Sequence, residues 1–498
     1  MMHFRFLLFL LLISNNSFAQ REAYSWIWGL CDSTENSCSG IYGTAVMRFN
    51  DDSIASIDTV SFPSDFFGFS TCISDSNGRM LMAFNNKYLF DSSGTILREY
   101  IAAEDELYYR QSALFFKLKD DSAVYYLLNS KAEQIAPPAD YPAMNNRTKY
   151  HLLTKIKTDA TGFEILSVDT LFRNDTLPAG SIHACRHANG RDWWIFQSTY
   201  NQKRYLRGLL TPEGLNFDFY EGPSLDLFQG WGFNKFSSDG KLLFHYIPGI
   251  TKKMQIYSFD RCTGELNNLE DINFSNWIET GDFNPFSLSP DGSKIYMGRS
   301  EPGPEISYQN IQIDVETHQM TVVADSVYVP CLTPNLKWVV SGYQEVPFTP
   351  IDRLNVFTQP NSLGNASGRI KNLYSLPVDG FIIEPPEWAN HLLGPIDGTI
   401  CDSLGLNDET GIKHIKEYSL LLYPNPGVDE LNIKTNIAVP IHITIRNAQG
   451  MLVFKSTLSQ SNFTLKDELI ELNAGIYFVE LSNETKHNRS VRKWMKLE

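Results

Sequence analysis

The sequence contains none of the short motifs that mark the commonest catalytic centres. There is no HExxH metalloprotease motif, no GxSxG nucleophile motif and no phosphate-binding glycine loop. The seven cysteines form no Cys-x-x-Cys pair, so a zinc or thiol redox centre of that kind is not indicated. We therefore predict no catalytic residue and no cofactor, and the sequence favours a binding protein over an enzyme.

A hydrophobic run long enough to span a bilayer is also missing. The apolar stretch Phe6–Ile13 is far shorter than the ~20 residues that a transmembrane helix needs, and no later stretch approaches that length. This stretch follows Arg5 and precedes Ser17-Phe18-Ala19, which is the pattern of a secretory signal peptide with its cleavage site. Residues 1–19 are therefore predicted to be a signal peptide. The exported protein would pass through the periplasm and have no transmembrane segment.

Positive charge is scarce over most of the chain. The net charge is −15, and the excess negative charge lies ahead of residue 420, because the residues after it carry nine Lys or Arg against eight Asp or Glu. An acidic body of this kind repels nucleic acid and anionic lipid. No nucleic-acid partner is predicted.

The residues ahead of 406 repeat a unit of apolar strand, polar turn and apolar strand. Its six instances are Thr71–Phe84, Leu114–Leu128, Ile182–Phe196, Phe233–Tyr246, Phe286–Gly298 and Val329–Tyr343. The turns are anchored at Gly78, Ser122, Gly190, Gly240, Gly292 and Leu336, and the Asn-Gly and Asp-Gly turns suit two-residue hairpins. Two further strand-like runs follow each unit. Four strands in about 45 residues predict a WD-like repeat, the blade of a β-propeller.

Six blades are visible in this repeat, and a seventh can be assembled from the two ends of the body. Residues 24–62 would supply three strands and residues 381–388 a fourth, so that one blade closes the ring and removes its exposed edges. The predicted fold is all-β, a seven-bladed β-propeller over residues 20–405, with six blades as the alternative. A polar linker, residues 406–419, follows it.

The last 79 residues, 420–498, form a separate unit of short strands with a period of two, separated by turn residues, which predicts a small β-sandwich. This tail resembles the type A C-terminal sorting domain of the Bacteroidetes type IX secretion system, an immunoglobulin-like fold. The resemblance rests on Tyr423, Pro424, Asn425 and Pro426, on Ile445–Phe454, on Leu472–Leu481 and on the closing strand Ser490–Lys496. Trp494 and Met495 depart from the smaller residues usual there. The resemblance implies export by the type IX machinery to the cell surface or the medium.

The body has a resemblance of its own. Its Ser-Asp-Gly and Pro-Asp-Gly turns are similar to those of TolB-like and WD-type propellers. It also resembles a propeller group of uncharacterised function, through Tyr24–Gly29, Ile73–Gly78, Phe259–Leu266 and Leu393–Leu406. This resemblance implies a fold and a secretion route but no activity.

Three kinds of side chain in the body are candidates for chemistry. His183, Cys185 and His187 alternate along one predicted strand and could share a face as metal ligands, although ordinary blade residues explain them better. The turn residues Asp75, Asp121, Asp239 and Asp291 suit a calcium site or an acid–base pair, but hairpin chemistry explains them better. The aromatic residues Trp193, Trp194, Trp231, Tyr246 and Trp388 could stack on sugars, with packing between blades as the simpler interpretation.

The cysteines Cys72, Cys185 and Cys331 occupy equivalent places in the repeat, and we interpret them as small buried residues. Cys31 and Cys38 are the pair that could most easily form a local disulfide.

Taken together, these features predict a surface-displayed or secreted propeller that binds a protein or glycan partner. Long insertions, such as 136–149 and 300–308, would supply the contact surface. A propeller-type glycoside hydrolase or lyase and a structural component of the cell envelope are the alternatives.

Overall fold

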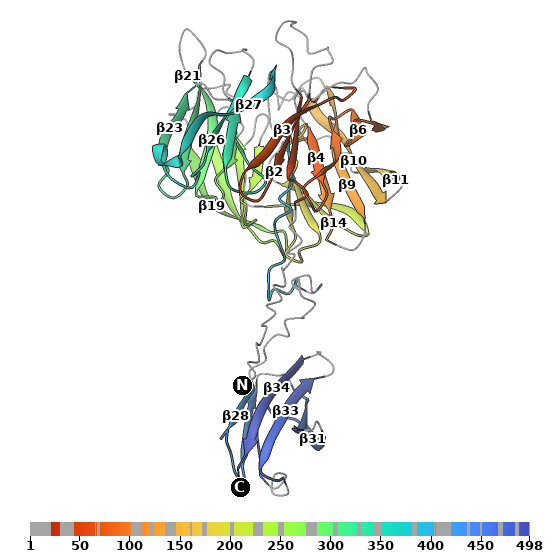
Figure 1. Cartoon of the computed structure of the whole chain (residues 1–498), viewed down its shortest axis with the longest axis vertical. Helices are drawn as coiled ribbons and strands as arrows, with labels where there is room; N and C mark the ends of the chain where they lie inside the picture. The colour runs from red at the N-terminus through yellow and green to blue at the C-terminus, as the bar shows by residue number, and fades with distance from the viewer. Residues whose placement is uncertain are drawn as a thin grey trace, which may run out of the picture. The chain divides into compact units, whose positions relative to one another are not determined.

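The computed structural model describes residues 21–29, 44–64, 66, 70–100, 111–119, 123–134, 146–159, 162–171, 177–199, 204–222, 233–247, 253–274, 286–301, 307–325, 330–342, 351–380, 386–402, 404, 420–435, 439–448, 451–466, 472–483 and 488–497. They belong to two compact units, Met1–Leu406 and Asn407–Glu498 (Figure 1). No helix in these residues is long and apolar enough to cross a membrane. The predicted signal peptide, linker and Cys31–Cys38 pair lie outside the described residues.

Seven antiparallel sheets follow one another along the described part of the first unit. Their strands are β1 (Ser25–Gly29), β2 (Thr44–Phe49) and β3 (Ile54–Val60); β4 (Thr71–Ser74), β5 (Met80–Phe84), β6 (Tyr88–Asp91) and β7 (Ile96–Glu99); β8 (Ala113–Lys117), β9 (Val124–Gln134), β10 (Asn146–Asp159) and β11 (Gly162–Leu171); β12 (His183–Arg186), β13 (Trp193–Ser198), β14 (Tyr205–Thr211) and β15 (Gly214–Tyr220); β16 (Phe233–Phe236), β17 (Leu242–Ile247), β18 (Lys253–Phe259) and β19 (Leu266–Asn273); β20 (Phe286–Leu288), β21 (Lys294–Glu301), β22 (Ser307–Asp314) and β23 (Met320–Asp325); and β24 (Cys331–Leu332), β25 (Val339–Gly342), β26 (Ile351–Phe357) and β27 (Arg369–Gly380). A short 3-10 helix, η1 (Gly364–Ser367), precedes β27.

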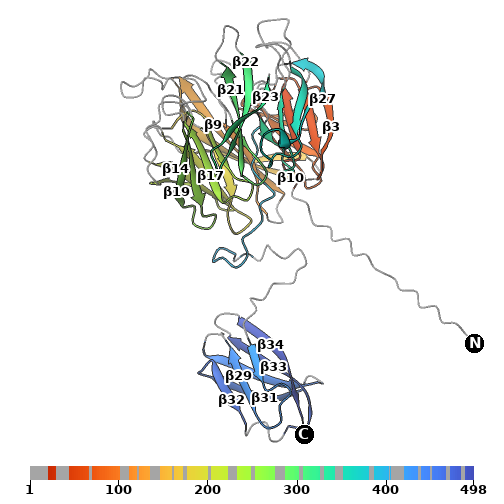
Figure 2. The same cartoon turned by 90° about the vertical axis from the view of Figure 1, so that its left-hand side faces the viewer.

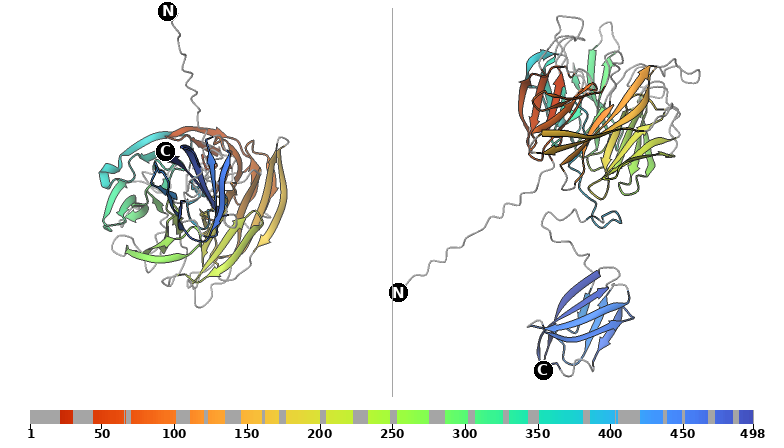
Figure 3. Two further views of the ribbon diagram at one scale, coloured as in Figure 1. Left: turned by 90° about the horizontal axis from the view of Figure 1, so that it is seen from below. Right: turned by 90° about the vertical axis from the view of Figure 1, so that its right-hand side faces the viewer.

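In every one of these sheets each strand pairs with its neighbour in the chain, so the sheet is a simple meander. Figures 2 and 3 show the sheets arranged around a common axis. The first strands of successive sheets, such as β1 and β4 or β12 and β16, contact one another and therefore lie innermost. This is the arrangement of a β-propeller.

The six predicted hairpins all form, and their turns explain why. Five of the six predicted turn anchors are described, and all have a left-handed φ: Gly78 (+80°), Gly190 (+74°), Gly240 (+69°), Gly292 (+72°) and Leu336 (+55°). The prediction of two-residue turns was wrong. The backbone N–H of Gly240 donates to Ser237 O and that of Ser237 donates to Leu242 O, so a four-residue turn ends in the left-handed glycine.

Apolar cores lie between neighbouring sheets. Ile27 and Val46 of the first sheet, for example, form one core with Ala83 and Phe90 of the second. Similar cores join each later sheet to the next. Because each sheet is covered on both faces, strands such as β13 are buried along their whole length. Burial of each large side chain contributes about 1.5–3 kcal/mol to stability.

The first and last sheets also share a core, which contains Trp26, Met47, Val340 and Val356. The joined blade predicted from both chain ends is tested only over the described residues. Residues 25–60 form a three-stranded sheet, and of the predicted fourth strand Glu387 forms a parallel bridge with Thr71 of the second sheet. Residues 381–385 of the predicted strand lie outside the described part of the chain.

The second unit consists of two sheets around one core. The strands of its first sheet are β28 (Leu420–Tyr423), β29 (Leu431–Thr435) and β32 (Asn462–Leu465), and those of its second are β31 (Leu452–Leu458), β30 (Ile441–Asn447), β33 (Gly475–Asn483) and β34 (Asn488–Lys496). Alternate residues point inward, such as Leu431 and Ile433 from the first sheet and Ile443 and Val479 from the second. The sequence did not indicate β32.

Candidate functional site

The three candidate metal ligands, His183 and Cys185 on β12 and His187 just after it, have different surroundings. His183 is buried and stacks on Phe236, with ring centroids 5.7 Å apart. The Cys185 thiol is fully buried, which raises its pKa to about 12. His187 makes a 3.1 Å hydrogen bond through Nε2 to Cys262 O. Within the described residues no group of three His, Cys, Asp or Glu could hold a metal ion, so the structure does not bring these three together as a metal site.

The acidic turn residues are engaged in their own hairpins. Asp239 accepts hydrogen bonds from Ser237 Oγ (2.7 Å) and from the backbone N–H of Lys241 (3.0 Å). Burial alone would raise the pKa of Asp239, but these hydrogen bonds hold it below its usual value. Asp75 and Asp291 cap their turns in the same way. The interpretation of these residues as turn residues is confirmed, while Asp121 lies outside the described residues.

Most of the candidate aromatic residues belong to the core. Trp193 and Tyr246 are fully buried and Trp194 nearly so, which agrees with packing between blades. Trp388 is partly exposed and lies in a different setting, described below. Trp231 lies outside the described residues. The prediction that Cys72, Cys185 and Cys331 are buried is confirmed, and none of the three forms a disulfide.

A segment that we call the C-terminal segment, residues 386–402, passes the inner strands from their first residues to their hairpin turns. At its start the N–H of Glu387 donates to Ser70 O (3.0 Å), just before β4. Further along, the side-chain amide of Asn390 donates to Ser238 O (2.8 Å), in the turn between β16 and β17. The N–H of Ile396 finally donates to Ala188 O (2.9 Å). The segment therefore links several sheets.

The C-terminal segment is tightly packed where it lies beside the hairpin turns. Pro395 covers Gly190, where an added Cβ would lie 2.6 Å from Pro395 Cδ. Arg261, which is largely buried, donates to Arg186 O (2.7 Å) and to Gly394 O (2.5 Å), and so joins two sheets to the segment. The contact of Pro395 with Gly190 and the position of Arg261 could not be predicted from the sequence, because both depend on the path of the C-terminal segment.

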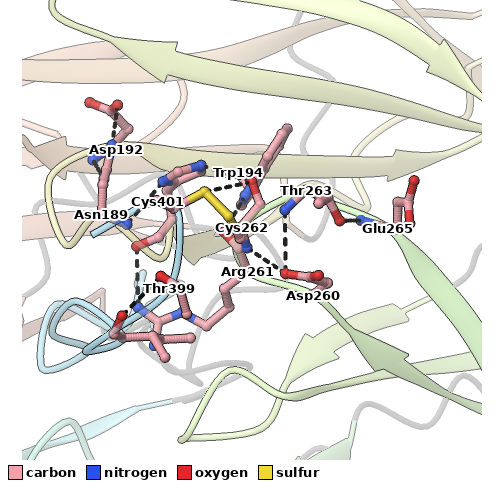
Figure 4. Close-up of a disulfide and its surroundings, with 12 residues drawn as sticks. Asn189, Asp192, Trp194, Asp260, Arg261, Cys262, Thr263, Glu265, Thr399 and Cys401 are labelled. Carbon is pink, nitrogen blue, oxygen red and sulfur yellow. Dashed lines mark hydrogen bonds between the residues drawn. A yellow bond between two sulfur atoms is a disulfide. The ribbon is translucent and has the colours of Figure 1, made fainter. Parts of the chain in front are cut away.

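A disulfide between Cys262 and Cys401 fixes the end of the segment. The two Cα atoms are 5.7 Å apart and the two residues are separated by 139 positions in the sequence. Figure 4 shows Cys262 in the turn after β18, where its N–H donates to Asp260 Oδ1 (2.7 Å) and where Trp194 Nε1 donates to Arg261 O (2.8 Å). The sequence analysis missed this pair, although the two cysteines lie in two of the four segments on which the propeller resemblance rests, Phe259–Leu266 and Leu393–Leu406.

A cavity lies where the C-terminal segment meets the inner strands. It encloses about 870 Å³ of empty space, including open solvent. Its walls include His183 from β12, Phe233 and Lys235 from β16, Phe286 and Leu288 from β20, Leu332 from β24, and Glu387 and Trp388 from the C-terminal segment. An apolar cavity with a few polar groups is the usual form of a ligand site.

Most polar groups in the cavity wall are already paired. Both ends of the Gln111 amide bond the backbone of Asn234, and Ser287 Oγ accepts from the N–H of Leu332 (2.7 Å). The amide of Asn390 donates to Ser238 and accepts from the N–H of Leu392.

Three further polar groups belong to residues of the wall. Lys235 Nζ and Glu387 Oε2 form a loose ion pair, 4.0 Å apart, with each side chain about one fifth exposed. The buried His183 Nδ1 has no hydrogen-bond partner. Burial, with a smaller contribution from Lys235, lowers the pKa of His183 to about 3, so its ring is neutral near pH 7. Of the residues that line this cavity, the sequence analysis had named only His183 and Trp388 as candidate site residues.

In the second unit the predicted sorting motif holds the closing strand β34. Asn425 Nδ2 donates to Lys493 O (2.8 Å), and Asn425 Oδ1 accepts from the N–H of Met495 (3.0 Å). Trp494 Nε1 donates to Pro424 O (3.0 Å), and its ring is fully buried. Trp494, which is unusual at this position, therefore takes part in holding β34. We call these contacts of Pro424 and Asn425 with β34 the clamp. Tyr423, by contrast, is largely exposed.

Comparison with known proteins assigns the tail. Residues 421–496 match the family described as secretion system C-terminal sorting domain. The tail therefore indicates export by type IX secretion, interaction with that machinery, and a secreted or outer-membrane surface location. No curated protein matches the chain in sequence.

Several solved propeller structures are similar to the chain at low identity. Periplasmic gluconolactonase PpgL of Pseudomonas aeruginosa is 14% identical, with a TM-score of 0.39, over 73% of this chain and 98% of that one. TolB of Acinetobacter baumannii is 13% identical, with a TM-score of 0.31, over 73% and 82%. PorZ of Porphyromonas gingivalis, described as an essential surface component of the type IX secretion system, is 12% identical, with a TM-score of 0.27, over 92% and 73%. These similarities assign no activity to this chain.

Proposed function

We propose that the protein is an extracellular or surface-attached propeller that binds a glycan or protein partner, and that the cavity beside the C-terminal segment is its contact site. The observation that carries this proposal is the cavity itself, whose wall combines aromatic and aliphatic side chains with the Lys235–Glu387 ion pair. An apolar pocket with a few polar groups is the usual form of a ligand-binding site.

The proposal extends to the architecture. We take the seven sheets as seven blades of a closed ring, supported by the core that the first and last sheets share. We also propose that residues 20–405 form the propeller, that residues 406–419 link it to the tail, and that the two-sheet tail is immunoglobulin-like. The assignment of residues 1–19 as a signal peptide stays a prediction. The N-terminal sequence of the exported protein tests it, and a start at Met1 would contradict it.

The function is tested by screening the purified full chain on a glycan array and in polysaccharide hydrolysis assays, and by capture of surface proteins after cross-linking. We expect binding without turnover. Lys235→Met should weaken that binding, whereas Lys241→Met, on an exposed turn of the same sheet, should leave it unchanged. Cleavage of any polysaccharide would replace the binding function with a carbohydrate-active enzyme. Failure to bind any glycan or protein would contradict the proposal.

A further inference from the structure

We infer that the secretion machinery recognises the tail through the outer face of its second sheet, and that the partner surface is apolar and bordered by carboxylates. We call this surface the apolar face and define it by Arg446, Leu452, Ile476, Phe478 and Lys493. The inference concerns the second unit and does not depend on the cavity of the first.

The register of the second sheet brings the side chains of the apolar face together. Leu452 of β31 pairs with Arg446 of β30, which pairs in turn with Phe478 of β33. β33 and β34 lie side by side (Figure 1), and Phe478 pairs with Lys493, so that one row of residues crosses all four strands. Ile476 lies on the same side of β33, two positions before Phe478. Because opposed residues have Cβ atoms about 4.5–5.5 Å apart, these side chains form one continuous surface.

The apolar members of this face are open to solvent. Leu452 is 49% exposed, Phe478 is 42% exposed and Ile476 is 39% exposed. Tyr477 and Val479, which alternate with them on β33, are buried in the core between the two sheets. A contiguous exposed apolar patch on a soluble domain marks an interaction site.

The outer face of the first sheet has a different composition. Its described outward side chains on β29 and β32 are all polar, namely Asn432, Lys434, Asn462 and Thr464. Outward positions of a β-sandwich are ordinarily polar because they face water. The second sheet departs from this rule at three outward positions, which indicates that its outer face becomes covered by a partner.

The family match supplies the partner. Residues 421–496 match the sorting domain, which implies contact with the secretion machinery. Within the sorting motif, Pro424 and Asn425 hold the strand β34. The strand held in this way directs Trp494 into the core and Lys493 to the apolar face. We therefore assign a structural role to these motif residues and recognition to the apolar face.

Charge specifies the chemistry of the partner further. Among the described outward residues of the second sheet, the cations are Arg446, Lys455 and Lys493, and the one carboxylate is Glu480. A net positive charge beside exposed apolar side chains is complementary to carboxylates beside an apolar surface. Such charges select the partner and fix its orientation, while the buried apolar side chains supply most of the affinity.

Export of the full chain from cells that carry the type IX machinery tests the inference. Phe478→Asp should lower the amount of protein on the surface and in the medium by about tenfold or more, with the chain retained in the periplasm. Phe478→Leu should be exported almost normally, and Lys493→Glu should be exported less well than the unaltered chain. Asn462→Asp and Lys434→Glu make the same charge changes on the polar face of the first sheet, and should have no effect.

Hydrogen exchange in the purified full chain separates recognition from folding, because the amides of β30 and β33 should be equally protected in every variant. If Phe478→Asp loses this protection, Lys493→Glu decides the question. Normal export of the folded face variants would overturn the inference, and so would an equal loss of export in Asn462→Asp. A loss of export in Tyr423→Ala, with both face variants exported normally, would place recognition at the sorting motif. Self-association that Phe478→Asp abolishes without affecting export would make the apolar face a contact between copies, and the inference would be wrong.

Discussion

The two units hold their last segments in place by different means. Among the described residues of the first unit the C-terminal segment forms a single β-bridge, between Glu387 and Thr71, and a disulfide fixes its end. In the second unit the closing strand β34 pairs with β33 along its whole length, from Gly475 opposite Lys496 to Asn483 opposite Asn488. A segment without a hydrogen-bonded ladder needs a covalent tie, whereas a fully paired strand needs only side-chain contacts to fix its register.

The interiors of the two units differ as well. The described part of the first unit buries five histidines, His151, His183, His187, His245 and His391. Burial lowers the pKa of His151 and His245 to about 4 and that of His183 to about 3, and it lowers the pKa of His391 well below the usual value. The described part of the second unit contains one histidine, His442, and it is not buried. Acid should therefore affect the two units differently.

The largest expected effect is the loss of stability of the first unit in mild acid. A histidine whose pKa is lower in the folded state gains a proton on unfolding, so stability falls as the pH falls below about 6.5 and continues to fall towards the folded pKa. Each of the three histidines with a folded pKa of about 3 or 4, His151, His183 and His245, should cost about 1–2 kcal/mol at pH 5 relative to pH 7. Thermal melts of the full chain should show one transition that moves strongly between these pH values and another that barely moves.

His442→Gln is the control for this experiment and should change neither transition. His245→Gln should reduce the pH dependence of the first unit. If both transitions moved equally with pH, the difference between the interiors would not explain acid stability.

The second prediction concerns the clamp on β34. Trp494→Ala removes a fully buried ring and its hydrogen bond to Pro424 O, at a cost of about 3–5 kcal/mol. Trp494→Phe keeps most of the ring and should cost about 1–2 kcal/mol. Hydrogen exchange in the full chain measures both, because the amides of β33 and β34 should lose protection while those of β13 do not. Unchanged protection in Trp494→Ala would show that the clamp does not stabilise the tail.

The third prediction concerns the covalent tie. Replacing Cys262 and Cys401 together with alanine should lower the stability of the first unit by about 2–4 kcal/mol, because the bond closes a long loop. Denaturation in urea, with and without a reductant, measures the effect. The reductant should destabilise the unaltered protein to the level of the double variant and leave the double variant unchanged. Equal stability with and without the bond would mean that the noncovalent contacts of residues 386–402 suffice.

The sequence predicted the parts of this structure that depend on local chemistry. The six hairpins were found because a left-handed glycine such as Gly240 and alternating apolar residues lie within one short stretch. The same reasoning located the three strands of the first sheet and identified Asp239 as a turn residue. It failed on the lengths of the turns, because Asp-Gly fits both a two-residue hairpin and a longer turn.

The path of residues 386–402 and the cavity beside it could not be predicted. Glu387 bridges Thr71, which is more than 300 residues earlier in the chain, and the Lys235–Glu387 pair joins β16 to the C-terminal segment. Such contacts follow from the closure of the whole ring and leave no local pattern. The sorting motif lies between these two cases. Its residues can be recognised in the sequence, but their contact with β34 could not be predicted from it.

The smallest effect is expected at Asn425, and it separates the two hydrogen bonds of the clamp. Asn425→Ala removes the bond to Lys493 O and the bond from the N–H of Met495, and should destabilise the second unit by about 1–2 kcal/mol. Asn425→Asp keeps the acceptor for Met495 and loses the donor to Lys493, so its effect should be intermediate. The protection of the β34 amides against hydrogen exchange in the full chain measures the effects of both variants. An aspartate variant as destabilised as the alanine variant would show that the donor to Lys493 O carries the interaction, and that the motif holds the strand through a single bond.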